Sequence, residues 1–121
     1  MLNLDTHVVI YFLGEALTDR ERDAILSEGA AISDIVLWEL AKLRQKGRAG
    51  VDLEGALFRS FLQKLAVYPI TPEIAQQSTQ LDFASDPADE IIAATSIVER
   101  LPLLTRDRIR THLRHKDAVP R

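Results

Sequence analysis

Four acidic residues in this sequence stand beside or inside apolar segments, where an uncompensated charge costs free energy. Asp5 and Asp107 each follow a short apolar run that is typical of a buried strand. The carboxyl ends of parallel strands meet at one edge of a sheet, so both side chains are expected there. Glu39 has apolar residues on both sides, and Asp89 opens an apolar helical segment, where the helix macrodipole favours an anion. Each acid alone also fits a helix cap, a turn or an ion pair.

Convergence of these four carboxylates would have a chemical consequence. Without a cation the acids repel one another, and the pKa of one or more of them rises. Mg²⁺ and Mn²⁺ prefer carboxylate and water oxygens as ligands, so either ion would relieve the repulsion. Such an ion lowers the pKa of a bound water, orients it for in-line attack and offsets charge in the transition state. The pattern therefore predicts metal-assisted phosphodiester chemistry, with one or two ions left open.

The elements that must position these acids alternate between short apolar runs and helical segments. We expect strands at residues 2–4, 30–33, 66–70 and 101–105, and a very short fifth strand at 118–119. Helices are expected at 8–13, 18–27, 34–46, 52–64, 71–81 and 88–100, with a short one at 108–113. Thr18 with Glu21 has capping-box spacing, and Thr71 before Pro72 is a second helix start. Ser33 and Asp34 are alternative caps for the third helix.

Alternating strands and helices predict an α/β fold, a Rossmann-like short parallel sheet of four to five strands with helices on both faces. The 121 residues fit a single domain spanning 1–121, and 46% apolar residues are enough for a core. The chain has no cysteine, which excludes a zinc ribbon, a disulfide scaffold and a thiol nucleophile. We see no signal peptide and no membrane span, so a cytoplasmic protein without membrane contact is expected.

The net charge of −3 is unusual for a protein that binds nucleic acid, but the cations are clustered. One basic stretch contains Lys42, Arg44, Lys46 and Arg48. A second contains Arg106, Arg108, Arg110, Arg114 and Lys116. Each stretch is interpreted either as a phosphate-binding surface or as a solvated helix face.

Four segments occur in a characteristic order and spacing: Leu4-Asp5-Thr6-His7, Ile32-Ser33 with Leu37-Trp38-Glu39-Leu40-Ala41, Asp86-Pro87-Ala88-Asp89-Glu90-Ile91-Ile92-Ala93-Ala94-Thr95, and Leu103-Leu104-Thr105-Arg106-Asp107. Together they resemble the PIN-domain family, and within it the VapC-type ribonuclease toxins of toxin–antitoxin modules. The resemblance implies a PIN-like sheet, Mg²⁺- or Mn²⁺-dependent cleavage of RNA, a homodimer and a VapB-type antitoxin partner that blocks the pocket.

By motif position, the resemblance implies that Asp5, Glu39, Asp89 and Asp107 are the catalytic and metal-binding acids. It assigns Thr6 and Thr105 to supporting roles behind the ligands. Arg106, next to the fourth acid, is interpreted either as a contact with the substrate phosphate or as a surface residue. Asp86 competes with Asp89 as the third ligand. Glu90 stands where many relatives carry arginine, and we expect its side chain to face solvent.

Other residues have less specific interpretations. Trp38 is expected in the core or in a dimer contact, rather than as a platform for a stacked base, and His7 in a structural hydrogen bond. Leu37, Leu40 and Phe58 are apolar positions that we assign to a dimer interface. A haloacid-dehalogenase-type phosphatase would need an aspartate where His7 stands. The remaining alternative is a PIN fold that binds or regulates without catalysis.

Overall fold

The structure is a computed structural model that describes residues 1–105 and 109–110. Six helices and five strands alternate along these residues. The strands are β1 (Leu2–Leu4), β2 (Ala30–Ser33), β3 (Ala66–Tyr68), β4 (Leu103–Leu104) and β5 (Ile109–Arg110). The helices are α1 (Thr6–Leu13), α2 (Asp19–Glu28), α3 (Ile35–Gln45), α4 (Ala56–Gln63), α5 (Pro72–Ser78) and α6 (Pro87–Glu99).

The strands form one sheet in the order β3-β2-β1-β4-β5. The first four are parallel, and the register pairs Asn3 with both Ala31 and Leu103. β5 runs antiparallel to β4 at the edge. The strand order reverses at β1, because its two neighbours come from opposite halves of the sequence. In open α/β sheets ligand sites lie beyond the carboxyl ends of the strands near such a reversal, which is where Asp5 follows β1.

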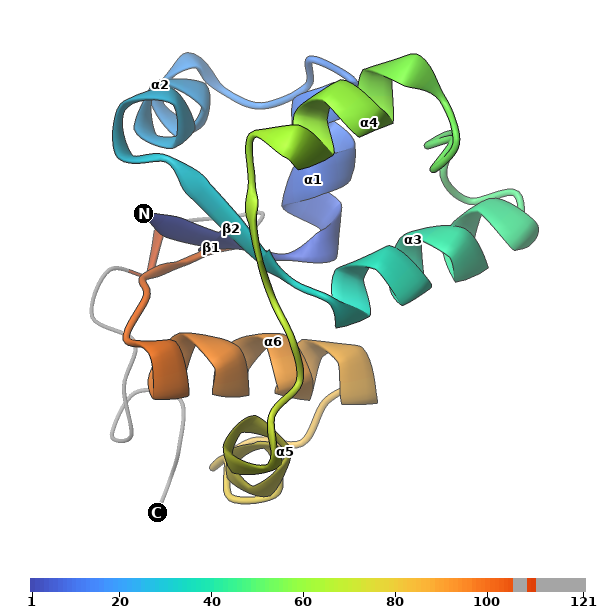
Figure 1. Ribbon diagram of the computed structural model, residues 1–121. Coiled ribbons are helices and arrows are strands. Elements are labelled where there is room, and N and C mark those ends of the chain that lie inside the picture. Colours follow the sequence, from blue (N-terminus) through green and yellow to red (C-terminus); the bar gives the residue numbers. More distant parts are fainter. Residues whose placement is uncertain (106–108, 111–121) are drawn as a thin grey trace.

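Helices cover both faces of the sheet, as expected. Figure 1 shows α1, α2 and α4 on one face and α5 and α6 on the other, while α3 extends from the carboxyl end of β2. The core between these layers is apolar: Leu4, Val8, Ile32 and Leu104 are fully buried. No helix within the described residues is long and apolar enough to cross a membrane.

Several helix starts follow the local signals in the sequence. The Thr18 side chain accepts from the Glu21 N–H, and the Glu21 carboxylate accepts from the Thr18 N–H, which completes the capping box of α2. Thr71 caps α5, with Pro72 at its first position. For α3 the N-cap position is Asp34, but its side chain makes no cap bond, and the Ser33 hydroxyl accepts from the Ile35 N–H instead.

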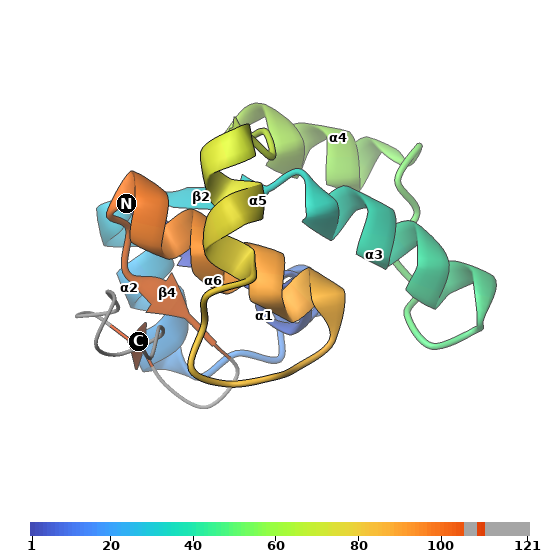
Figure 2. The same cartoon turned by 90° about the horizontal axis from the view of Figure 1, so that it is seen from below.

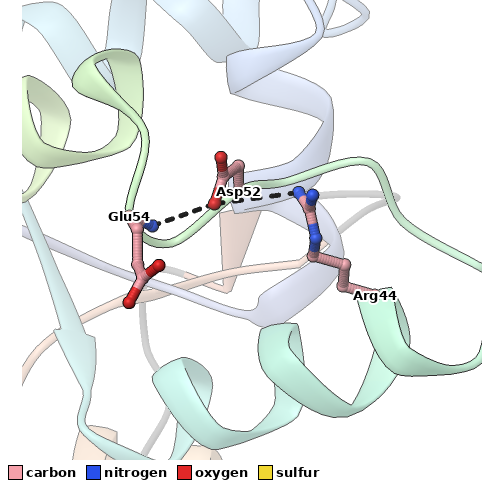
Figure 3. A network of polar contacts seen from close by, with 3 residues as sticks. All are labelled: Arg44, Asp52 and Glu54. Atoms are coloured by element: carbon pink, nitrogen blue, oxygen red, sulfur yellow. Dashed lines mark hydrogen bonds and ion pairs between the residues drawn. The ribbon is translucent and has the colours of Figure 1, made fainter.

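The predicted helix at 52–64 is shorter in the structure, because α4 begins only at Ala56. The Asp52 side chain accepts from the Glu54 N–H, and the Asp52 carbonyl accepts from the Gly55 N–H. These bonds form a turn that competes with helical geometry. Figure 3 shows Asp52 between Glu54 and Arg44, whose guanidinium lies 3.9 Å from the Asp52 carboxylate. The turn therefore fastens the loop to the end of α3.

The predicted helix at 108–113 is wrong in its first residues, because Ile109–Arg110 form strand β5. Pairing with β4 supplies backbone partners that an isolated helical turn would lack, and tertiary pairing overrides weak local propensity. The sheet is accordingly parallel in four strands and antiparallel in the fifth. The strand expected at 118–119 lies outside the described residues.

Candidate metal and active site

Three helices begin at the carboxyl edge of the sheet, and each carries one of the predicted acids near its start. Asp5 is the N-cap of α1, Glu39 lies in the second turn of α3 and Asp89 in the first turn of α6. α3 packs against both α1 and α6. Figures 1 and 2 show the starts of α1, α3 and α6 converging at this edge. The fold thus brings the three described acids into one neighbourhood.

Asp5 is the most constrained of the three acids. Its carboxylate accepts a 2.9 Å hydrogen bond from the Val8 N–H, and its own N–H donates to the Leu104 carbonyl at 3.3 Å. Burial raises the pKa of Asp5, and the negative charges of Asp89 and Glu39 raise it further. The Val8 bond and the charge of His7 lower the Asp5 pKa, but burial outweighs them. The ionised form of Asp5 is therefore energetically disfavoured when no cation is present.

Glu39 is half-buried and fixed by α1. The hydroxyl of Thr6, itself buried, donates to the Glu39 Oε1 atom. Thr6 follows Asp5 directly, so one short segment supplies an acid and the hydrogen bond that orients another acid. The supporting role expected of Thr6 stays a prediction, and within the described residues Glu39 forms no ion pair with a lysine or arginine.

Asp89 is exposed, and no sequence pattern identified the residue that holds it. The Ser85 hydroxyl donates to the Asp89 Oδ2 atom at 3.1 Å, and the Ser85 N–H donates to the Glu90 Oε2 atom at 3.1 Å. Ser85 therefore ties both acids to the segment before α6. Glu90 is half-buried rather than fully directed to solvent. Asp86 is the exposed N-cap of α6 and makes no side-chain cap bond.

A buried asparagine sets the distance between β1 and α6. The Asn3 Nδ2 atom donates to the Ile92 carbonyl at 3.1 Å and to the Ser96 hydroxyl at 2.8 Å. Asn3 lies two residues before Asp5, and Ile92 three residues after Asp89. The bond therefore couples the elements that carry these two acids. In the sequence, the role of Asn3 was indicated only by its being a polar residue inside a three-residue strand.

The charge balance of this neighbourhood fits a hard cation. Within the described residues, no lysine or arginine forms an ion pair with Asp5, Glu39 or Asp89. The donors are oxygen atoms only, which suits Mg²⁺ or Mn²⁺. The described part of the chain nevertheless holds no group of three acids or histidines close enough to enclose a metal ion. A complete set of metal ligands therefore needs an oxygen ligand besides those of Asp5, Glu39 and Asp89.

Asp107 and Arg106, both predicted at the site, lie outside the described residues. The chain approaches the site on that side, because Leu104 accepts the Asp5 N–H and Thr105 is half-buried directly after β4.

The apolar side chains singled out on α3 and α4 divide between core and surface. Trp38 is 55% exposed, which excludes the core and leaves the dimer contact, its other expected position, as a prediction. Leu40 and Phe58, which we assigned to a dimer interface, are buried in the core and are not available for one. Leu37 is half-buried and packs against the core. Helical spacing identifies these positions as apolar, but it does not tell which faces the neighbouring layer covers.

Two apolar hollows lie on the face formed by α1, α2 and α4. One, of about 410 Å³, lies between α1 and the start of α4 and is lined by Ile10, Val51 and Phe58 among others. The second, of about 300 Å³, lies between α1, α2 and α4 and includes Ile25 and Phe61. Leu57 lines both and is 67% exposed. This face therefore presents uncovered apolar surface away from the acids.

Comparison with known proteins decides the family. The family model described as PIN domain matches residues 3–116. The chain belongs to the PIN-domain family. This PIN domain is 34% identical to "Ribonuclease VapC22" of Mycobacterium tuberculosis over 126 aligned positions, which cover 96% of this chain and 94% of the relative. That likeness places it among the VapC-type members.

Solved structures of toxin–antitoxin complexes share the fold of this PIN domain. A "Toxin-antitoxin complex from Klebsiella pneumoniae" aligns with a TM-score of 0.66 at 23% identity, covering 88% of this chain and 87% of the other. VapBC2 from Rickettsia felis, bound to a DNA fragment from its promoter, aligns at 0.63 with 20% identity and 85% coverage of each chain. FitAcB from Neisseria gonorrhoeae aligns at 0.60 with 24% identity and 88% coverage of each.

Proposed function

We propose that this chain is the toxin of a VapBC-type toxin–antitoxin module and that it hydrolyses phosphodiester bonds in RNA with Mg²⁺ or Mn²⁺. The observation that carries the proposal is the uncompensated negative charge around Asp5, in a chain whose curated relative is a ribonuclease. Residues 1–121 form one PIN domain in this proposal, and the protein acts in the cytoplasm, where its RNA substrate is found.

In this proposal Asp5, Glu39, Asp89 and Asp107 hold the ion. When bound, the ion supplies an acidified water and neutralises charge that develops on the phosphate. The chain's own residues prepare the pocket for it. Val8 and Leu104 fix Asp5 through backbone bonds. Thr6 orients Glu39. Ser85 restrains Asp89. Thr105 orients Asp107, and Arg106 contacts the substrate phosphate.

The test is cleavage of RNA by the purified chain without antitoxin. We expect cleavage that requires Mg²⁺ or Mn²⁺, stops with a chelator and disappears in Asp5→Asn. Asparagine is as good a helix cap as aspartate, so α1 should still form. Asp82→Asn, an exposed acid outside the site, is the matched control and should cleave normally. RNA cleavage that survives in Asp5→Asn would remove Asp5 from the ligand set.

The same experiment discriminates the alternative function. A PIN fold retained only for binding or regulation would show no metal-stimulated cutting that Asp5→Asn removes. The uncompensated acids argue against that alternative, because a binding module has no use for an ionised carboxylate that burial disfavours.

We also propose a VapB-type antitoxin as partner and a homodimer as the assembly. One solved neighbour of the same fold is described as a toxin–antitoxin complex and another as VapBC2 bound to promoter DNA, which supports a partner here. The hollows beside Leu57 offer uncovered apolar surface for an antitoxin segment. Sedimentation of the isolated chain tests the dimer, and a monomer at all concentrations would exclude it.

Leu57→Asp tests the antitoxin surface. The residue is 67% exposed, so the variant should fold, cleave RNA normally and bind antitoxin at least about tenfold more weakly, because a charge replaces buried apolar area. Arg59→Asp, an exposed change on the same helix, is the control. Unchanged affinity in Leu57→Asp would show that the antitoxin binds elsewhere.

A further inference from the structure

The exposed ring of Trp38 is the feature that the proposed function leaves unexplained. Trp38 is 55% exposed and is the single tryptophan of the chain. It directly precedes Glu39 on α3, so its backbone adjoins that of one acid of the candidate site. Tryptophan is enriched at binding interfaces, because its ring offers a large apolar contact area and its N–H a polar group.

Cations continue from this ring along one face of α3. Residues four apart share a helix face, so Trp38, Lys42 and Lys46 form a row, which we call the α3 stripe. The row spans about 12 Å at 1.5 Å per residue. The Lys42 Nζ atom lies 5.8 Å from the centre of the Trp38 ring, and both lysines are exposed. Such a contact is weak at an exposed site, so a flat ligand can replace Lys42 over the ring.

Arg44 does not belong to the stripe, because it turns toward the loop. Its guanidinium lies 3.9 Å from the Asp52 carboxylate. Figure 3 draws this contact between α3 and the loop that follows it. Within the described residues, neither Lys42 nor Lys46 has an acidic partner. The stripe thus combines an exposed aromatic ring with uncompensated positive charge, next to a residue of the acidic site.

We propose that the α3 stripe binds single-stranded RNA, with an unpaired base stacked on Trp38 and the flanking phosphates on Lys42 and Lys46. Stacking on an aromatic ring combined with cations that follow the backbone is how proteins hold single strands. The inference rests on the proposed ribonuclease function, and it adds where the substrate enters and that its bases must be unpaired.

Charge complementarity favours RNA over a second copy of the chain. A twofold interface centred on the α3 stripe would bring Lys42 and Lys46 of one copy close to those of the other. Like charges without intervening acids oppose that contact, whereas phosphates neutralise them.

Fluorescence of the single tryptophan tests the proposal without any cleavage. Metal-free protein in chelator is titrated with an unstructured RNA of about ten nucleotides, within the usual range of single-strand sites. The same RNA annealed to its complement is the comparison. We expect saturable quenching by the single strand and at least about fivefold weaker binding of the duplex, because paired bases are not free to stack.

Variants separate stacking from charge. In fluorescence anisotropy with labelled RNA, Trp38→Leu should weaken binding roughly fivefold or more, whereas Trp38→Phe should retain most of it. Leu26→Ala, another exposed apolar residue, should have no effect. Lys42→Gln should lower the slope of log K against log salt by about 0.7, and Lys64→Gln should not.

Two outcomes would overturn the proposal. One is RNA that binds by anisotropy without quenching Trp38 and with equal affinity in Trp38→Leu. The other is a change of Trp38 emission with protein concentration alone, in step with dimer formation, which would make the ring an interface between copies. RNA cleavage without quenching of Trp38 would contradict the RNA-binding role of the stripe and leave the proposed ribonuclease function intact. Quenching without metal-dependent cleavage would contradict the ribonuclease function and leave RNA binding by the stripe.

Discussion

Asp5 and Asp89 both stand at helix starts on the same edge of the sheet, yet their surroundings differ. Asp5 is held by two backbone bonds, and burial raises its pKa. Asp89 is exposed, and its hydrogen-bond partner is the hydroxyl of Ser85. Asp5 is half-buried, with a fixed position and an unfavourable charge, whereas Asp89 is exposed and solvated. In our proposal Asp5 therefore supplies most of the affinity for metal, and Asp89 completes the ligand set.

The largest effect should come from removing each acid and measuring Mn²⁺ affinity. Asp5→Asn should weaken Mn²⁺ binding by at least about a hundredfold, and Asp89→Asn by about tenfold, because a charge in a less polar environment interacts more strongly. Both variants can be measured by calorimetry without RNA. A larger loss in Asp89→Asn than in Asp5→Asn would reverse the comparison.

Thr6→Val should produce the next largest loss. Valine has the shape of threonine but cannot donate to Glu39, so the carboxylate loses its orientation. We expect about tenfold to a hundredfold lower cleavage, with a melting temperature close to that of the parent. Thr6→Ser keeps the hydroxyl and should recover most of the activity. If Thr6→Val cleaves like the parent, Thr6 has no role in positioning Glu39.

The fold could be predicted largely from the sequence, because strand and helix signals are local. Thr18 with Glu21 and Thr71 with Pro72 announce helix starts that need only neighbouring residues. The start of α4 and the strand β5 were missed, because side-chain turns and edge pairing compete with periodicity. These contacts depend on geometry that periodicity does not encode.

In the candidate site, too, some residues could be predicted from local sequence and others depend on contacts formed only in the fold. Asp5, Glu39 and Asp89 could be picked out by their unusual positions, but Asn3 and Ser85 could not. The bond from Asn3 joins residues 93 positions apart, and only the folded sheet brings them together. The exposure of Trp38 depends on which layer fails to cover α3, which no local pattern reveals.

A pH titration sharpens the comparison further. The raised pKa of Asp5 means that protons compete with metal at a higher pH than for an ordinary aspartate. Mn²⁺ affinity should therefore be complete above the Asp5 pKa and fall about tenfold per pH unit below it. The drop should begin at a higher pH than an aspartate with an unshifted pKa would give, and Asp5→Asn should remove this contribution. Affinity that stays constant down to about pH 4 would contradict the assigned direction.

The smallest effect is expected for Ser85→Ala. This change removes an exposed hydrogen bond to Asp89 while keeping the backbone bond to Glu90. Net contributions of such bonds are about 1 kcal/mol or less, so metal affinity should fall by roughly fivefold at most. Ser27→Ala, an exposed serine on α2, is the control. A loss as large as that of Thr6→Val would mean that Asp89 is held as rigidly as Glu39.

The central place of β1 has a consequence for synthesis of the protein. β1 is made first, but one of its two neighbours is β4, and Leu4 pairs with Leu104. A nascent chain therefore keeps its earliest strand incomplete until almost the whole described sequence has left the ribosome. Pairings this distant in sequence form slowly. The edge of the sheet that carries Asp5 is therefore completed only when β4 has been made.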